Sequence, residues 1–321
     1  MKTSVKNRFF FGMIMFLICV GVLFLTFYFY GLIYDIFVLI LMICAAHEMS
    51  NALAYKFEKP GFVMQVLTIL VSYAAFKTVS LLSDPEEDPY GFHAIVAYFV
   101  VFLLMCVFIF VANMASSRRT GESVIASLFC MVYPVAIMFF MLAVNHLPGA
   151  DKGLAFTGWD YDTGAGEAFA PNYRAVAIVM TFVAASMSDI MAFAVGSAFR
   201  GPKFAPMISP KKTISGAIGG FIGGIMGGAI VFALSLWGVG GITALHENTV
   251  ISIVLYLSMG LCIGVATEMG DLMASYVKRY CGVKDYGSLI PGHGGIMDRI
   301  DGMMVAAFAT YIYMAILVYV S

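Results

Sequence analysis

Apolar residues fill nine long stretches of this chain, and short breaks of proline, glycine or charged residues separate them. Each stretch has roughly the 20 residues that a helix needs to cross the hydrocarbon core of a bilayer. The pattern therefore predicts nine membrane-spanning helices. Their expected ranges are 9–29, 32–54, 62–82, 92–114, 122–146, 174–198, 213–238, 250–277 and 300–320.

Composition agrees with this interpretation. The chain is 61% hydrophobic and only 12% charged, with a mean hydropathy of +0.93, whereas a soluble domain is about 45–50% apolar. We therefore expect an all-α, polytopic integral membrane protein whose surroundings are the lipid bilayer. The net charge of −1 gives no reason to expect nucleic acid as a partner. Its six cysteines form no CxxC pair, which argues against a zinc site or a disulfide framework.

Basic residues set the expected orientation, because loops on the cytoplasmic side carry an excess of lysine and arginine. With the N-terminus inside, all of the 18 Lys and Arg residues except Lys77, Lys152 and Arg174 fall in inside segments. The acidic loop 83–89 then lies outside. The sequence predicts a cytoplasmic N-terminus and an outside C-terminus. It also suggests three regions: N-terminal helices (1–120), a middle span with an outside loop (121–173) and a C-terminal catalytic region (174–321).

One span is unusually rich in glycine: residues 214–232 read ISGAIGGFIGGIMGGAIVF. Glycines four residues apart let helices approach closely within lipid. Tight helix packing is the favoured interpretation, and direct contact with a lipid substrate is the alternative.

Carboxylates gather near the expected cytoplasmic side of the C-terminal region. Such groups are costly within a span and usually functional. The acids are Asp189, Glu268, Asp271, Asp298 and Asp301. Because basic loops lie next to them, the pattern suggests a site for a divalent cation and a phosphate group, with magnesium sharing its shell between carboxylates and substrate.

Two local patterns support that chemistry. Asp271, Ser275 and Lys278 are spaced to share one helix face. Residues 291–295, Pro-Gly-His-Gly-Gly, precede a helix start, where main-chain N–H groups can cradle an anion. Structural interpretations stay open for each feature: positive anchors for the basic residues, helix-dipole acids for Asp298 and Asp301, and a turn residue for His293. A structural role is also favoured for His47, Glu48 and Asn51, at the inner end of the second span.

The C-terminal region resembles the phosphatidate cytidylyltransferases, also called CDP-diacylglycerol synthases. The resemblance is carried by a 27-residue signature, Ser275-x-x-Lys278-Arg279-(four residues)-Lys284-Asp285-x-Gly287-x-x-Ile290-Pro291-x-His293-Gly294-Gly295-Ile296-x-Asp298-Arg299-Ile300-Asp301. Upstream, Ser188-Asp189 and the run Ser209-Pro210-Lys211-Lys212-Thr213 also look like this family. Arg200-Gly201-Pro202-Lys203 departs from the usual Gly-Lys pattern and leaves the role of Lys203 open.

The resemblance implies that CTP and phosphatidate react, with Mg²⁺, to give CDP-diacylglycerol and pyrophosphate. A second, monovalent cation and a homodimer are left open. The implied catalytic residues are Asp271, Asp298, Lys278 and Arg299. Metal ligands would be Asp271 and Asp298, then Asp189 and Asp301. Substrate phosphates would be held by Ser209, Lys211, Lys212, Thr213, Ser275, Arg279, Lys284, His293, Gly294 and Gly295. The expected location is a bacterial plasma membrane, with the site facing the cytoplasm.

Other functions remain as alternatives. A cytidylyltransferase acting on another lipid phosphate, or a CTP-dependent lipid kinase, would use similar groups. A transporter should spread its polar residues along a path, whereas here they gather at one side. The CDP-alcohol phosphotransferases require an Ala-Arg pair after an Asp-Gly pair, and no such pair follows Asp301-Gly302.

Overall fold

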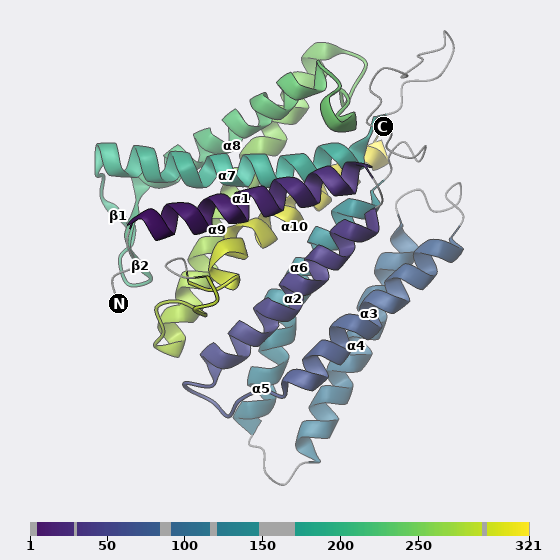
Figure 1. Cartoon of the computed structure of the whole chain (residues 1–321), viewed down its shortest axis with the longest axis vertical. Coiled ribbons are helices and arrows are strands. Elements are labelled where there is room, and N and C mark those ends of the chain that lie inside the picture. Colours follow the sequence, from purple (N-terminus) through teal and green to yellow (C-terminus); the bar gives the residue numbers. More distant parts are fainter. Residues whose placement is uncertain are drawn as a thin grey trace. The chain divides into compact units, whose positions relative to one another are not determined.

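The structure is a computed structural model that describes residues 5–28, 31–83, 91–115, 121–147, 171–290 and 294–320. Long helices dominate these residues (Figure 1). They are α1 (Val5–Tyr28), α2 (Gly31–Leu53), α3 (Phe62–Leu82), α4 (Phe92–Met114), α7 (Tyr173–Phe199), α8 (Ile214–Ser235), α9 (Thr249–Cys281) and α10 (Met297–Val320).

The segment between α4 and α7 is a helix interrupted by proline. It consists of α5 (Gly121–Cys130), the π-helical turn η1 (Met131–Ala136), α6 (Ile137–Ala143) and the short 3₁₀ turn η2 (Val144–His146). Pro134 lies within η1. Proline has no N–H to donate and crowds the preceding turn, so the wider π-turn is the expected local response.

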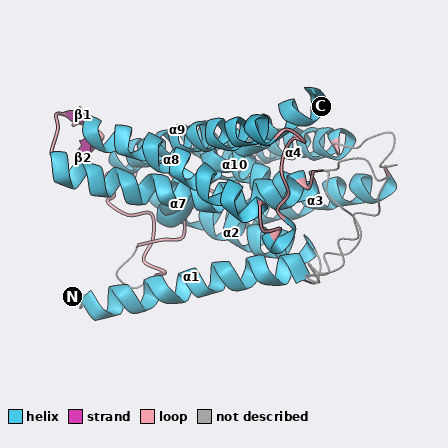
Figure 2. Ribbon diagram, turned by 90° about the horizontal axis from the view of Figure 1, so that it is seen from above, coloured by secondary structure: helices cyan, strands magenta, loops and turns pink. Residues whose placement is uncertain are grey.

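These helices confirm an all-α, polytopic integral membrane protein. Among the described residues, eight helical segments are long and apolar enough to cross a membrane, from Gly31–Leu53 to Met297–Val320. The expected count of nine spans and the orientation of the two termini stay predictions. A short hairpin that the sequence did not predict, β1 (Lys203–Ala205) paired antiparallel with β2 (Ser209–Thr213), joins α7 to α8. Figure 2 shows it in magenta at one end of these two helices.

Contacts divide the chain into two compact units, each assembled from distant segments. The first contains residues 1–17, 36–143 and 277–300, and the second contains 18–35, 144–276 and 301–321. Helices α9 and α10 therefore contribute to both units. The three regions expected from the sequence group the chain differently, along its length, and remain a prediction.

Aromatic side chains form the core of the first unit. Tyr98 on α4 stacks on Phe139 of α6 with ring centroids 3.7 Å apart, and Phe76 of α3 meets Phe139 edge to face at 5.4 Å. All three are buried. Such pairs add to the stabilisation that burial of their large surfaces provides.

Glycine contacts form the core of the second unit. Gly223 and Gly227 of α8 lie against the main chain of α7 at Met187 and Ala184. On the other side of α8, a Cβ at Gly224 or Gly228 would collide with the main-chain oxygen of Gly260 or Tyr256, both on α9. These contacts confirm close helix packing as the role of the glycine-rich span.

A polar cluster of the second unit lies where α2 begins. The fully buried carboxylate of Asp35 accepts a hydrogen bond from Asn145 Nδ2 at 2.8 Å and lies 3.1 Å from His146 Nε2. Arg174 Nε donates to Asn145 Oδ1 at 3.0 Å. The hydrogen bonds compensate the cost of placing a carboxylate inside an apolar helix.

We predict that Gly224→Ala destabilises the protein by about 1–3 kcal/mol, because the added methyl group meets main-chain atoms that cannot move aside alone. Gly21→Ala is the matched control, since nothing lies within 4 Å of the position that its Cβ would take. Thermal unfolding of both purified variants in the same detergent checks this. Equal melting temperatures would contradict the packing argument.

Candidate functional site

The hairpin positions a lysine against α9. Lys203 pairs with Thr213 across the two strands, and Ile214 N donates to Pro202 O at 2.9 Å. Thr213 then begins α8 as its N-cap, accepting from Gly216 N at 3.1 Å. This anchoring leaves Lys211 exposed, while the next residue of the strand, Lys212, is half-buried.

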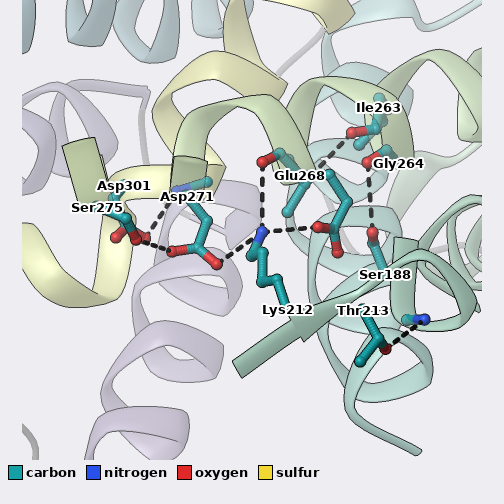
Figure 3. A network of polar contacts seen from close by, with 12 residues as sticks. Ser188, Lys212, Thr213, Ile263, Gly264, Glu268, Asp271, Ser275 and Asp301 are labelled. Atoms are coloured by element: carbon teal, nitrogen blue, oxygen red, sulfur yellow. Dashed lines mark hydrogen bonds and ion pairs between the residues drawn. The ribbon is translucent and has the colours of Figure 1, made fainter. Parts of the chain in front are cut away.

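Lys212 lies between two carboxylates of α9. Its Nζ is 2.6 Å from Glu268 Oε2, 2.8 Å from Asp271 Oδ2 and 3.4 Å from the main-chain oxygen of Glu268 (Figure 3). Ser275 Oγ donates to Asp271 Oδ1 at 3.3 Å. We call Lys212, Glu268, Asp271 and Ser275 the Lys212 cluster. Lys212 of the SPKKT run and Asp271 of α9, both candidate site residues, therefore lie together in the second unit.

Charge keeps Lys212 protonated. Burial alone would lower its pKa, but the negative charges of Asp271 and Glu268, together with the hydrogen bonds to both, more than offset this effect. The pKa of Lys212 is therefore raised above its ordinary value. The ammonium group of Lys212 is therefore a fixed positive charge beside α9.

The first turn of α10 approaches α9 next to this cluster. A Cβ at Gly270 would lie 2.5 Å from the main-chain oxygen of Asp301 and 2.9 Å from Gly302 Cα. Asp301 Oδ1 accepts from Gly302 N at 2.9 Å. Asp301 is thus close in space to the residue that precedes Asp271. Asp189, by contrast, is an exposed side chain of α7.

Asp298 organises a second group of residues. Its Oδ1 accepts from Lys278 Nζ at 2.9 Å, and its Oδ2 accepts from the main-chain nitrogens of Tyr286 at 2.8 Å and Gly295 at 3.0 Å. The Asp298 side chain is 4% exposed. We call Lys278, Tyr286, Gly295 and Asp298 the Asp298 cluster. Charge-assisted bonds of this kind are the stronger ones.

Glu48 joins this arrangement from α2. Its carboxylate accepts from Ile296 N at 3.0 Å and from Met297 N at 2.8 Å. The sequence favoured a structural role for Glu48 but did not identify its partners, which are 248 and 249 positions away along the chain. Its one signal in the sequence was a carboxylate within a span. Glu268 was recognised among the acids but was not assigned a role, and it belongs to the Lys212 cluster of the second unit.

A groove of about 1390 Å³ lies beside Glu48 in the first unit. Its walls come from the end of α2 and from residues 282–289. They include His47, Asn51, Tyr55 and Lys284. Polar and aromatic side chains therefore line a groove whose walls include residues of the signature.

The other expected site residues differ in exposure. Arg279, Lys284 and Arg299 are exposed, Ser209 is half-buried, and Gly294 adopts a left-handed conformation with φ of 85°. His293 lies outside the described residues. The roles in catalysis, substrate binding and metal binding that the sequence suggested for all these residues stay predictions.

The Lys212 cluster fits a divalent cation by its donor chemistry. Two carboxylates and one carbonyl oxygen already surround a positive charge, the ammonium of Lys212. Hard oxygen donors are what Mg²⁺ prefers, and it commonly takes only one or two carboxylates and completes its shell with substrate phosphates and water. Within the described parts of the chain, no three His, Cys, Asp or Glu side chains form a metal-binding group by themselves.

Fold and site together define an integral membrane protein whose paired acidic and basic groups suit anionic ligands. Comparison with known families is consistent with this class. The model of the cytidylyltransferase family matches residues 6–317, and the chain belongs to that family.

Individual relatives carry a more specific name. The chain is 40% identical over 143 residues to a phosphatidate cytidylyltransferase of Brucella abortus, a match that covers 43% of this chain and 47% of the relative. It is 38% identical over 139 residues to one of Mycobacterium bovis, covering 42% and 40% of the two chains. One of Rickettsia typhi is 39% identical over 120 residues, covering 37% and 50%. The matched segments thus span about half or less of these relatives.

We predict that Lys212→Met lowers the free energy of unfolding by about 1–2 kcal/mol, since Asp271 is partly screened by solvent. A raised lysine pKa stabilises the folded state fully below the unfolded value of about 10.4, and this contribution is lost only as pH rises through the folded pKa. The difference from wild type should therefore be equal at pH 7 and pH 9.

Chemical unfolding at the two pH values measures that difference. Lys203→Met, an exposed lysine of the same hairpin, is the control and should change stability by less than about 0.5 kcal/mol. A difference that shrinks between pH 7 and pH 9 would show that Lys212 is not held protonated by its two acids.

Proposed function

We propose that this protein is a phosphatidate cytidylyltransferase that converts CTP and phosphatidate into CDP-diacylglycerol and pyrophosphate. The proposal is supported by the family match over residues 6–317 and by the name that the relatives share. Because those relatives are matched over about half their length or less, their activity is carried over here as a proposal. We place the reaction at the cytoplasmic face of a bacterial plasma membrane.

The observation that carries the proposal is the organisation of the signature around Asp298. One carboxylate holds Lys278 and two main-chain N–H groups, so a lysine, an acid and the amides of Tyr286 and Gly295 occupy fixed positions. Arg299 follows directly in α10. Such an arrangement of cations and N–H groups is suited to a polyphosphate.

The chemistry requires little beyond positioning and charge. Phosphatidate brings its own nucleophile, because a phosphate monoester has a second pKa near 6 and is mostly dianionic at neutral pH. An oxygen of this phosphate forms a bond to the α-phosphorus of CTP. The bond from that phosphorus to the β-phosphate oxygen breaks, and pyrophosphate leaves with its electron pair. No protein base has to remove a proton.

Repulsion between two anions is then the main obstacle. Lys278, Arg279, Lys284 and Arg299 would bind the triphosphate and the departing pyrophosphate, and Lys211 or Lys212 would bind a phosphate of either substrate. Ser209, Thr213 and Ser275 would add hydroxyl donors. Asp271 and Asp298 would hold Mg²⁺, with Asp189 and Asp301 as further candidates. When bound, Mg²⁺ supplies positive charge that offsets the charge of the phosphates.

The test is to incubate purified protein with labelled CTP, Mg²⁺ and phosphatidate, and to measure a lipid-soluble cytidine product and pyrophosphate in equal amounts. We predict that Asp271→Asn and Asp298→Asn each lower the rate at least about hundredfold, as loss of a preorganised charge commonly does. Glu247→Gln, an exposed acid outside the site, should leave it unchanged.

Two results would count against the proposal. Wild-type protein that forms no cytidine lipid from phosphatidate would reject it, and a product formed from a polyprenyl phosphate supplied in parallel would favour the alternative lipid substrate. Near-normal rates for both folded Asp variants would reject their assignment as metal ligands.

A further inference from the structure

The start of α10 is stabilised by a side chain from another helix. The first N–H groups of a helix have no partner within it and need an acceptor. Here Glu48 of α2 provides two: Oε1 for Ile296 N at 3.0 Å and Oε2 for Met297 N at 2.8 Å. Glu48 is 6% exposed. A negative charge at this end of the helix is also favoured by the helix dipole.

Glu48 and Asp298 together accept hydrogen bonds from four main-chain N–H groups of the signature. Asp298 takes those of Tyr286 and Gly295, and Glu48 takes the two that follow, at Ile296 and Met297. Asp298 is the next residue along the chain. The place of its carboxylate therefore depends on the two amides that Glu48 holds.

Two glycines of the signature make room for the Glu48 carboxylate. A Cβ at Gly287 would lie 2.5 Å from Glu48 Oε1 and 2.8 Å from its Cδ, and Glu48 supplies all three of the nearest atoms. A Cβ at Gly295 would likewise meet only the Glu48 carboxylate. Neither glycine has a positive φ, unlike Gly294. Space for Glu48, and not backbone conformation, explains why these positions hold glycine.

We propose that Glu48 is a positioning residue for the transfer reaction. It fixes the main chain at Ile296 and Met297, directly before Asp298, so that Asp298, and with it Lys278 and Arg299, occupy productive positions. Both Glu48 oxygens bind main-chain amides, so it acts through the main chain at the start of α10. The kinetic part of this inference rests on the proposed function, whereas the structural part does not.

Hydrogen exchange tests the structural part in protein of any activity. In Glu48→Gln the side chain keeps its size but loses its charge and one acceptor, so exchange at Ile296 and Met297 should become at least about tenfold faster. Glu48→Asp, whose carboxylate is one methylene shorter, should give an intermediate rate. Glu58→Gln, an exposed glutamate that follows the same helix, should match wild type.

Kinetics test the positioning part. Glu48→Gln should lower kcat for cytidylyl transfer at least about tenfold, while the KM for phosphatidate changes less than about threefold, because ground-state lipid binding does not use Asp298 alone. A purely structural cap would instead lower the amount of folded protein and leave kcat per folded molecule unchanged. That result would overturn the proposal.

Gly287→Ala, which keeps Glu48, leaves the proposal testable even if Glu48→Gln does not fold, and a double-mutant cycle extends the test where a Glu48 variant folds. Gly287→Ala should lower kcat about tenfold or more in the wild-type background, where its methyl group meets Glu48. In a Glu48→Ala background the same change should cost less than about threefold, because the colliding carboxylate is gone. Equal losses in both backgrounds, or wild-type exchange at Ile296 and Met297 in a folded Glu48 variant, would overturn it. An inactive wild-type enzyme with the expected exchange pattern would reject the proposed function alone.

Discussion

The cost of burying charge determines how the polar parts of this structure are arranged, because neither lipid nor apolar side chains can solvate an ion. The buried carboxylates of Glu268, Asp298, Glu48 and Asp35 are each met by donors. Glu268 lies against the ammonium of Lys212, Asp298 accepts from Lys278 and two main-chain amides, and Glu48 accepts from two amides at the start of α10. The Asp35 carboxylate likewise accepts a hydrogen bond from the Asn145 amide. Main-chain N–H groups inside a helix are already hydrogen-bonded, so the donors for these carboxylates come from side chains and from main chain outside helices or at a helix start. The hairpin, through Lys212, and the main-chain amides of Tyr286, Gly295 and Ile296 meet carboxylates for that reason.

Glycine residues provide the space that these contacts between helices and carboxylates require. The stripe on α8 lets α7 and α9 approach through their main chains, and it continues as far as the Lys212 cluster. A Cβ at Gly220 would lie 2.8 Å from Glu268 Oε1 and 3.1 Å from Ser188 Oγ. The helix packing and the site therefore depend on the same residue type. Gly287 has the corresponding role beside Glu48 in the first unit. In both units a missing side chain leaves the volume that a carboxylate occupies.

Sequence reasoning predicted the elements better than their partners. The apolar run 250–277 corresponds to α9, Thr249–Cys281, and 300–320 corresponds to α10, Met297–Val320, because span length is a local property of the chain. The resemblance also assigned Asp271 and residues of the SPKKT run to one candidate site. It could not show that Lys212 would pair with Glu268, that Thr213 would cap α8, or that Ser209–Thr213 would form a strand. The contact between Glu48 and Ile296 joins residues 248 positions apart, and no local pattern encodes it.

Burial separates the basic residues of the site into two groups. Lys212 and Lys278 are fixed by carboxylates 2.6–2.9 Å away, so part of their charge is already compensated. Lys211, Arg279, Lys284 and Arg299 are exposed, and an approaching anion can reach them at lower desolvation cost. The proposed reaction between two phosphates would use both groups of basic residues. The buried lysines define positions, because a rigid charge loses little entropy when it binds, while the exposed residues supply positive charge that attracts a polyanion from solution. Lys211 is therefore better suited than Lys212 to a first contact with phosphate, although the sequence presents them as neighbours of the same type.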